Sequence, residues 1–188
     1  DHVEYYLMHM LNDAATWGRL QEFGIQEWME EKKAKGQIYN IGFSFHGGTD
    51  NFIKVLDAYH WDFCQIQLNY MDKDTQATLK GVALAEKLGI PMIIMEPVKG
   101  GSLAKLPHDG IDELFKKARH EASTSSWALR YVGSFDNVKV VLSGMSTPEQ
   151  VRDNLETFGD FQPLSQAEND VVEQAARAVK SRVRNGCT

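Results

Sequence analysis

The sequence predicts an α/β fold built on a parallel sheet. Short apolar runs alternate with segments of helical periodicity along nearly the whole chain, and strands that alternate with helices pair in parallel through crossover connections. The chain has 188 residues, of which 43% are hydrophobic and 24% charged. It is therefore long enough to bury a core, and its length is that of one domain.

Runs of aromatic, β-branched and other apolar residues predict strands at residues 3–9, 38–45, 63–69, 92–95 and 138–142. The run at 92–95 is continuously apolar, so we expect it to be buried on both faces. Apolar residues at helical spacing, with glycine stops and capping residues, predict helices at residues 23–35, 49–56, 75–88, 111–121, 123–132, 148–158 and 165–183.

Two architectures fit this order of elements. One is an open doubly wound sheet, and the other is part of a (β/α)₈ barrel, for which about 250 residues are typical. Five strands are too few to close such a barrel. No G-x-G-x-x-G motif follows the first strand, which argues against half of a Rossmann fold. The pattern alone leaves both architectures open.

Composition excludes several classes of partner. The net charge of −6 and the absence of a basic run argue against nucleic acid, and no apolar stretch reaches the roughly 18 residues that a membrane span needs. Cys64 and Cys187 make no disulfide framework, and Cys64 is expected to be a buried, inert thiol, which together predict a cytoplasmic setting. Since the chain lacks an initiator Met and a strand begins at residue 3, we expect the chain to start inside a fold.

Polar residues recur where the predicted strands end. His9, Ser44, Asn69, Glu96 and Ser143 each occupy such a position. Ligands bind at the carboxyl ends of strands in parallel α/β folds. The sequence therefore predicts a ligand site at this edge of the sheet. The histidines show no ligand spacing, so no zinc site is expected.

The same regions are similar, in order, to motifs of the aldo-keto reductases, in the bacterial branch whose members carry a ferredoxin-like cluster tail. The matching segments are residues 1–11 (DHVEYYLMHML), 41–47 (IGFSFHG), 65–72 (QIQLNYMD), 95–104 (MEPVKGGSLA) and 142–155 (LSGMSTPEQVRDNL). The resemblance implies a (β/α)₈ barrel whose fourth to eighth strands this chain supplies, with the N-terminal strands missing from the chain. Residues 1–160 would be the partial barrel, and residues 161–188 an extra helix leading toward a truncated cluster-binding tail.

The reaction that this resemblance implies is hydride transfer from NAD(P)H to an aldehyde or ketone. The family uses a tyrosine acid tuned by a lysine, with an aspartate and a histidine nearby, and His9 matches the histidine that donates a hydrogen bond to the carbonyl oxygen. The other three lie on the family's first three strands, and Tyr5 and Tyr6 are not substitutes. The chain alone is therefore expected to be inactive. The alternative role for His9 is a core histidine bonded to backbone.

The resemblance also implies cofactor contacts. Ser44 and Gln65 would bind the nicotinamide carboxamide, although Phe45 stands where many members have Asn, and Met95 would pack on the nicotinamide ring. Asn69 would line the substrate pocket. The loop toward the pyrophosphate would contain Pro97, Lys99, Gly100 and Gly101, and the adenosine end would meet Ser143, Gly144, Met145, Ser146, Gln150 and Asn154. Each has an ordinary alternative: a polar strand end, a core methionine, a plain turn or a solvated helix face.

The sequence leaves two questions about cofactors open, which are the choice between NADP and NAD and the presence of a 4Fe-4S cluster. Members that prefer NADP place Arg or Lys where this chain has Ser143, Ser146 and Gln150, and Arg152 is expected to face elsewhere on its helix, so the cofactor is NADP or NAD. Cys187 would be the first ligand of a 4Fe-4S cluster that forms in the intact protein only, and the alternative is a stray terminal cysteine.

Three functions therefore compete. The first is a reductase of a small carbonyl compound, the second a non-catalytic nicotinamide-binding regulatory or scaffold barrel, and the third an open-sheet phosphate-binding domain. The barrel hypothesis predicts exposed edge strands at residues 3–9 and 138–142, through which the chain could self-associate. The open-sheet hypothesis predicts a sheet that is covered on both faces.

Overall fold

The fold, obtained as a computed structural model, contains the predicted sheet. The structure describes residues 1–106 and 110–182. Its five strands lie in the order β1-β2-β3-β4-β5, and the pairs from β1 to β4 are parallel. The strands are β1 (Val3–Met8), β2 (Ile38–Phe45), β3 (Phe63–Gln67), β4 (Met92–Met95) and β5 (Val138–Val141). The predicted parallel α/β fold is confirmed.

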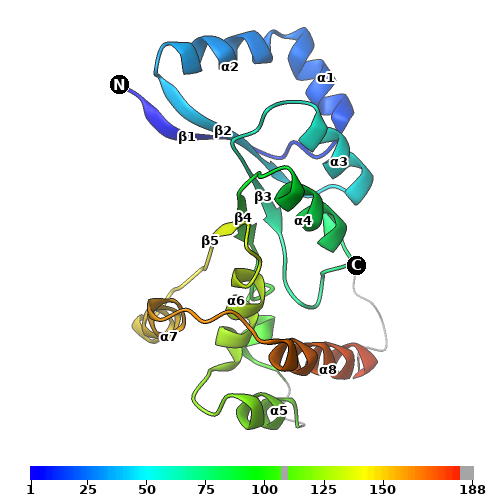
Figure 1. Cartoon of the computed structure of the whole chain (residues 1–188), viewed down its shortest axis with the longest axis vertical. Helices are drawn as coiled ribbons and strands as arrows, with labels where there is room; N and C mark the ends of the chain where they lie inside the picture. Colours follow the sequence, from blue (N-terminus) through cyan, green and yellow to red (C-terminus); the bar gives the residue numbers. More distant parts are fainter. Residues whose placement is uncertain (107–109, 183–188) are drawn as a thin grey trace. The chain divides into compact units, whose positions relative to one another are not determined.

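The strand order separates the two architectures. A doubly wound sheet reverses its order at a switch point, whereas here each strand neighbours the next one along the chain. Right-handed crossovers that always step the same way place every helix on one face of the sheet. Accordingly α1 packs against α2 and α3, and α3 packs against α4, in one row beside the strands (Figure 1). These helices are α1 (Ala14–Glu22), α2 (Ile25–Ala34), α3 (Thr49–Asp57) and α4 (Thr78–Lys87).

The two faces of the sheet differ in burial. Phe43, Cys64 and Met92 occupy one register row, and all three are fully buried on the face that meets the helices. Because side chains alternate along a strand, the next residues point to the other face. There Ile93 and Met95 are only half-buried, so the expectation that residues 92–95 are buried on both faces was wrong.

An aromatic cluster fills the space between the sheet and the helices. The Phe43 ring centroid lies 4.8 Å from that of Trp61 and 6.0 Å from that of Phe52, and Trp17 meets Trp61 at 5.2 Å. Offset and edge-on contacts of this kind add to the stabilisation that comes from burying large rings. Gly81 lets α4 approach this cluster, since a Cβ there would lie 2.6 Å from the Phe52 ring.

The chain forms two compact units, which we describe separately. The first contains residues 1–67, 74–95 and 137–140, and the second contains the described residues of 68–73, 96–136 and 141–188. In the second unit α6 is almost entirely buried, and the Trp127 ring stacks on Phe115 at 4.8 Å. Its helices are η1 (Ser102–Ala104), α5 (Ile111–Ala118), α6 (Thr124–Gly133), α7 (Pro148–Gly159) and α8 (Gln166–Arg182). The predicted boundary at residue 160 stays a prediction.

Several element boundaries differ from those predicted. Helix α1 was missed because only Trp17 is buried in it, which leaves weak periodicity; its signal was Asp13, whose side chain accepts from the Thr16 amide 2.6 Å away. Strand β3 ends at Gln67 instead of residue 69 because Asn69 starts a turn. Cys64 is buried as expected, and burial raises the pKa of its thiol to about 12.

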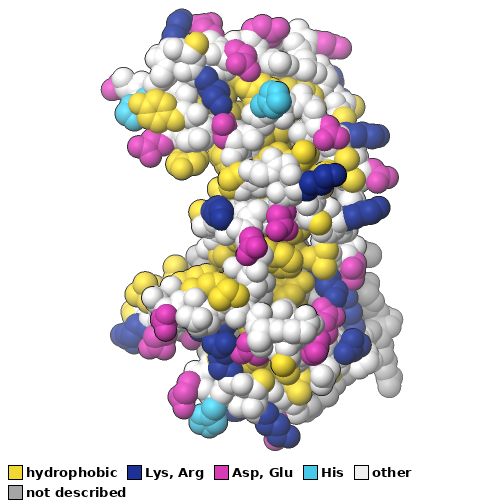
Figure 2. All heavy atoms as spheres, in the orientation of Figure 1, with side chains coloured by type: hydrophobic (Ala, Val, Ile, Leu, Met, Phe, Trp, Pro, Cys, Tyr) yellow, Lys and Arg dark blue, Asp and Glu magenta, His cyan; other side chains and the backbone are white. Residues whose placement is uncertain are grey.

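The edge strands are exposed, as the barrel hypothesis predicted. Strands β1 and β5 end the sheet, and Tyr5 is 67% exposed while Val140 is 44% exposed. On the face shown in Figure 2, Lys and Arg side chains of the described residues are interspersed with Asp and Glu and form no single basic patch. No helix among the described residues has the length and apolar character that a membrane crossing requires.

Gly42 tests the packing of β2 against β3. A Cβ at this position would lie 2.5 Å from the backbone oxygen of Phe63, which cannot move without breaking the strand pairing. We expect Gly42→Ala to lower the free energy of unfolding by about 2 kcal/mol, measured by urea denaturation.

Gly18→Ala is the matched control. Gly18 lies inside α1, and nothing lies within 4 Å of its Cβ position. Alanine should stabilise this helix by roughly 0.5–1 kcal/mol. Equal effects of the two substitutions would contradict the close approach at Gly42.

Candidate functional site

Three of the predicted site residues form one row across neighbouring strands of the first unit. Ser44 of β2 pairs with Gln65 of β3. Met8, the last residue of β1, pairs with Phe43, so His9, the residue after Met8, lies opposite Ser44. Laterally paired residues of a parallel sheet point to the same face. The row therefore lies on the face opposite the helices, at the carboxyl ends of the strands.

Ser44 connects β2 to the turn that follows β1. Its hydroxyl accepts a hydrogen bond from the Met10 amide at 2.8 Å and lies 3.1 Å from His9 Nδ1, and its carbonyl accepts from the Leu11 amide at 2.9 Å. Met10 has a φ of 55°, so the chain turns sharply after the histidine. Ser44 is fully buried, whereas His9 is exposed.

The Gln65 amide is half-buried and, within the described part of the chain, has no hydrogen-bond partner. An amide in this state can donate and accept at the same time, so it can bind a group that also does both. One row farther along, Gln67 pairs with Met95, and the Gln76 amide donates to Gln67 Oε1 at 2.7 Å. On the open face, the Gln65 amide is therefore free to bind a ligand, whereas the Gln67 amide is already hydrogen-bonded to Gln76.

Asn69, which was predicted to line a substrate pocket, holds a turn in the second unit. Its Oδ1 accepts from the amides of Met71 and Asp72 at 3.0 and 2.9 Å, and its Nδ2 donates to Asp72 Oδ2 and to the Glu96 carbonyl. The side chain is fully buried. These contacts explain the residue as a turn former, and the substrate role stays a prediction.

The loop after β4 is tightly turned. Lys99, Gly100 and Gly101 have φ values of 48°, 60° and 88°, the left-handed region in which glycine is least strained. Pro97 is buried at its start. The Lys99 ammonium pairs with the Asp72 carboxylate, so its charge is engaged within this unit. A pyrophosphate would have to compete with that carboxylate for Lys99.

The loop that precedes α7 is held by side chains of the helix itself. Gln150 Oε1 accepts from the Ser146 amide at 2.7 Å, from the Ser146 hydroxyl at 3.2 Å and from the Thr147 amide at 3.2 Å. Thr147 completes a capping box with Gln150. The Asn154 amide donates to Ser143 Oγ at 2.8 Å. Gln150 and Asn154 therefore organise the loop instead of standing free on the helix surface.

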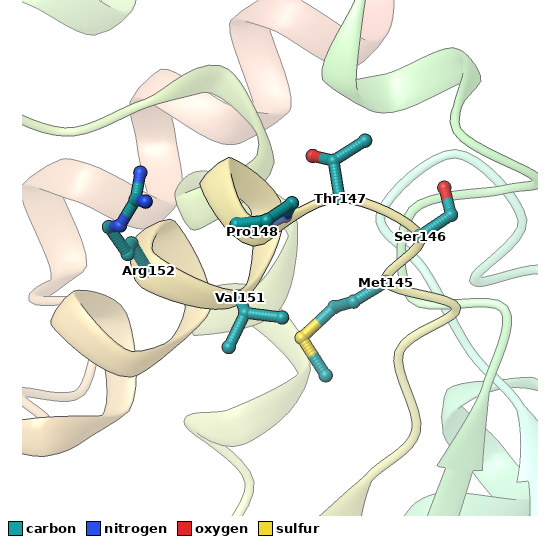
Figure 3. Close-up of a pocket in the computed structure, with 6 residues that line it drawn as sticks. All are labelled: Met145, Ser146, Thr147, Pro148, Val151 and Arg152. Atoms are coloured by element: carbon teal, nitrogen blue, oxygen red, sulfur yellow. The ribbon is translucent and has the colours of Figure 1, made fainter.

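A pocket of about 560 Å³ lies beside this loop (Figure 3). Its walls are mainly the apolar side chains of Met145, Pro148 and Val151. Gly144, which comes directly before Met145 in the chain, is exposed. Arg152 is also among the lining residues, but in Figure 3 its side chain points away from Met145 and Ser146, and the expectation that it faces elsewhere stays a prediction. Its guanidinium lies 3.6 Å from the Glu149 carboxylate on the same helix.

Sequence reasoning missed Asp153, which fastens α7 to α6. The hydroxyls of Ser123 and Ser125 donate to Asp153 Oδ2 at 2.8 and 2.6 Å, and Ser123 is also the N-cap of α6. A carboxylate near a helix N-terminus is favoured by the helix dipole. The available signal was the S-x-S sequence at the start of the helix predicted at residues 123–132, which marks a cap but does not reveal its partner.

The described residues offer no metal centre. Within residues 1–106 and 110–182 no group of three or more His, Cys, Asp or Glu side chains could hold a metal ion. Cys64 is buried with a raised pKa, so it is a poor thiolate ligand. Cys187, the predicted first cluster ligand, lies outside the described residues.

A comparison with models of protein families identifies one family. A family model described as the Aldo/keto reductase family matches residues 1–177. Comparison with curated protein sequences gives no match. Many solved structures are similar, among them an aldo-keto reductase from Bacillus halodurans in its apo form, with 21% identity and a TM-score of 0.72 over 95% of this chain and 63% of that one.

Two further structures are similar to a comparable extent. One is an aldo/keto reductase from Klebsiella pneumoniae in complex with NADP and acetate, with 20% identity and a TM-score of 0.71 over 93% of this chain and 59% of that one. The other is a glycerol dehydrogenase from Gluconobacter oxydans, with 18% identity and a TM-score of 0.69 over 100% of this chain and 61% of that one. The chain thus spans about three fifths of the length of these structures, and the likeness concerns the fold.

Substitution of Asp153 tests whether this carboxylate holds α7 against α6. Asp153→Ala removes the acceptor of two serine hydroxyls, and hydrogen bonds to a charged group contribute roughly 1.5–3 kcal/mol. We expect the free energy of unfolding to fall by about 2 kcal/mol and amide exchange to accelerate in α7. Glu156→Ala, an exposed position on the same helix, should change stability by less than about 0.5 kcal/mol. Similar losses in both variants would show that Asp153 does not fasten α7.

Proposed function

The chain belongs to the aldo/keto reductase family, and we propose that it is the cofactor-binding part of an oxidoreductase that reduces an aldehyde or ketone with NAD(P)H. One observation carries this proposal most directly. The exposed His9 ring and the unpartnered Gln65 amide occupy one row on the open face of the sheet, with Ser44 between them. Carbonyl reduction needs groups that hold the nicotinamide and groups that stabilise the developing oxyanion.

His9 is the proposed catalytic residue. Ser44 holds its Nδ1 at 3.1 Å, so the other ring nitrogen, Nε2, is the one that can donate to a carbonyl oxygen. A donor aimed at the position where negative charge develops stabilises the transition state more than the ground state. His9 would thereby polarise the carbonyl group without supplying the final proton.

The residues of the first unit fit a nicotinamide. The free Gln65 amide can pair with a carboxamide by one donated and one accepted hydrogen bond, and Met95 is half-buried on the same face. When bound, the nicotinamide supplies the hydride. The roles of this unit are to orient the ring and to hold the carbonyl compound.

In the second unit, we propose the loop before α7 and its pocket for the adenosine end. The apolar walls of Met145, Pro148 and Val151 suit a purine face, and the loop hydroxyls of Ser143 and Ser146 suit a ribose. The loop with Lys99, Gly100 and Gly101 is the proposed neighbour of the pyrophosphate. Arg152 is the cation among the residues that line the pocket, and it pairs with Glu149. NADH and NADPH should therefore be compared directly by fluorescence titration.

The proton donor is proposed to come from further polypeptide of a complete barrel. Tyr6 packs against Trp28 on the helix side, and Tyr5 lies within β1 four positions before His9, away from the carboxyl end of the strand, so neither is proposed as the acid. Support also comes from the solved structures, which are longer than this chain. Strands β1 and β5 would pair with the remaining strands, or with a second copy when the chain is alone. The described residues do not fit a 4Fe-4S cluster, so no step is assigned to one.

His9→Ala tests the catalytic role in a polypeptide that carries the complete barrel. Loss of a preorganised donor to the oxyanion should lower kcat on the order of 100-fold or more, while NADH affinity changes little. Turnover is followed by NADH absorbance with a panel of aldehydes and ketones, and cofactor affinity by fluorescence titration.

His60→Ala is the control, because His60 is exposed and lies beyond α3 instead of at the carboxyl ends of the strands. Its kcat should match the wild-type value. Unchanged turnover in His9→Ala would refute the catalytic role. Tight NADH binding without turnover of any carbonyl compound would instead support a non-catalytic nicotinamide-binding barrel.

A further inference from the structure

The Ser44 hydroxyl stands between a backbone amide and a histidine ring. It lies 2.8 Å from the Met10 nitrogen and 3.1 Å from His9 Nδ1. The Met10 amide can only donate, so the Ser44 oxygen accepts from it. This first contact is fixed in its polarity, whereas the second depends on where the imidazole carries its proton.

The burial of Ser44 determines which atom donates in the contact between its hydroxyl and His9 Nδ1. Ser44 is 0% exposed, so its hydroxyl hydrogen cannot bond to bulk water. Within the described residues His9 Nδ1 is the acceptor that lies within reach of this hydrogen. If Nδ1 carried a proton, two hydrogens would face each other or the buried hydroxyl hydrogen would stay unpaired, and an unpaired buried donor is costly.

We infer that Ser44 is a positioning residue that donates its hydroxyl hydrogen to His9 Nδ1 and so fixes the neutral imidazole with its proton on Nε2. The ring nitrogen that faces away from Ser44 is then always a donor. This inference differs from the role that the sequence predicted for Ser44, which was to bind the nicotinamide carboxamide. The carboxamide role is left to Gln65, whose amide is free.

The backbone around the histidine limits its movement. The Leu11 amide donates to the Ser44 carbonyl at 2.9 Å, so residues on both sides of Met10's left-handed turn are bound to Ser44. The next residues are also tied, because the His46 amide donates to Asn12 Oδ1 at 2.7 Å. A Cβ at Gly47 would lie 2.2 Å from the Asn12 carbonyl oxygen, which shows how closely these two turns approach.

The consequence for chemistry rests on the proposed function. A carbonyl oxygen accepts hydrogen bonds and cannot donate one, so only the Nε2–H tautomer of neutral His9 can bind it through the outer nitrogen. A histidine free to exchange tautomers would spend part of its time with a bare Nε2 facing the substrate. Ser44 removes that non-productive state before the substrate arrives.

The tautomer can be measured on the 188-residue chain without any substrate. Long-range ¹H–¹⁵N correlation spectra, recorded at a pH of about 8.5 where ordinary histidines are neutral, distinguish a protonated ring nitrogen from a bare one. His9→Gln identifies the His9 signals. We expect one tautomer in the wild type, with Nδ1 bare and Nε2 protonated.

Three serine variants then test the cause. Ser44→Ala should shift the tautomer ratio on the order of tenfold toward the Nδ1–H form, and Ser44→Thr, which keeps the hydroxyl, should retain the wild-type spectrum. Ser134→Ala is the matched control, because the Ser134 hydroxyl also accepts from a backbone amide, Leu164 at 2.8 Å, and donates to a carbonyl, Arg130 at 2.6 Å. It should leave the His9 signals unchanged.

NADH titration separates this inference from the proposed function. A changed tautomer with unchanged NADH affinity in Ser44→Ala supports the positioning role. An unchanged tautomer with weakened NADH affinity overturns it and assigns Ser44 to the cofactor. A mixed or Nδ1–H tautomer in the wild-type spectrum, which needs no variant, overturns it as well. If neither the wild type nor any variant binds NADH or NADPH, the proposed function fails while the tautomer result stands.

Discussion

The parallel register of β1, β2 and β3 is the constraint on which the rest of the site depends. Each strand pairs with its successor, and the pairings Met8 with Phe43 and Ser44 with Gln65 fix which residues share a row. Because side chains alternate along each strand, one register determines both the aromatic core on the helix face and the polar row on the open face. A shift of one residue would exchange them.

The polar contacts near the strand ends are largely internal to the protein. Ser44 binds the turn after β1, Asn69 binds its own turn, and Gln150 binds the loop before α7. Such contacts hold the loops in place. A ligand that binds through the same backbone amides would have to compete with these side chains. The Gln65 amide is the exception on the open face, since it is free, and this distinguishes a residue able to bind from residues that position others.

The sequence could predict the strands, their parallel pairing and the polar residues at their ends, because periodicity and chain order determine these features. It could not decide between the two sheet architectures, since strand order depends on tertiary contacts; the observed order excludes the doubly wound sheet. It placed Ser44 and Asn69 at strand ends but could not reveal their partners, which lie on other segments. Asp153 was missed because its partners are serines about thirty positions away.

The register itself can be measured most directly by nuclear Overhauser contacts between the backbones of β1, β2 and β3. We expect contacts that pair Met8 with Phe43 and Ser44 with Gln65. A pattern displaced by one residue, with Ser44 beside Cys64 or Ile66, would turn Ser44 toward the helices and would contradict the shared row on which the site is built.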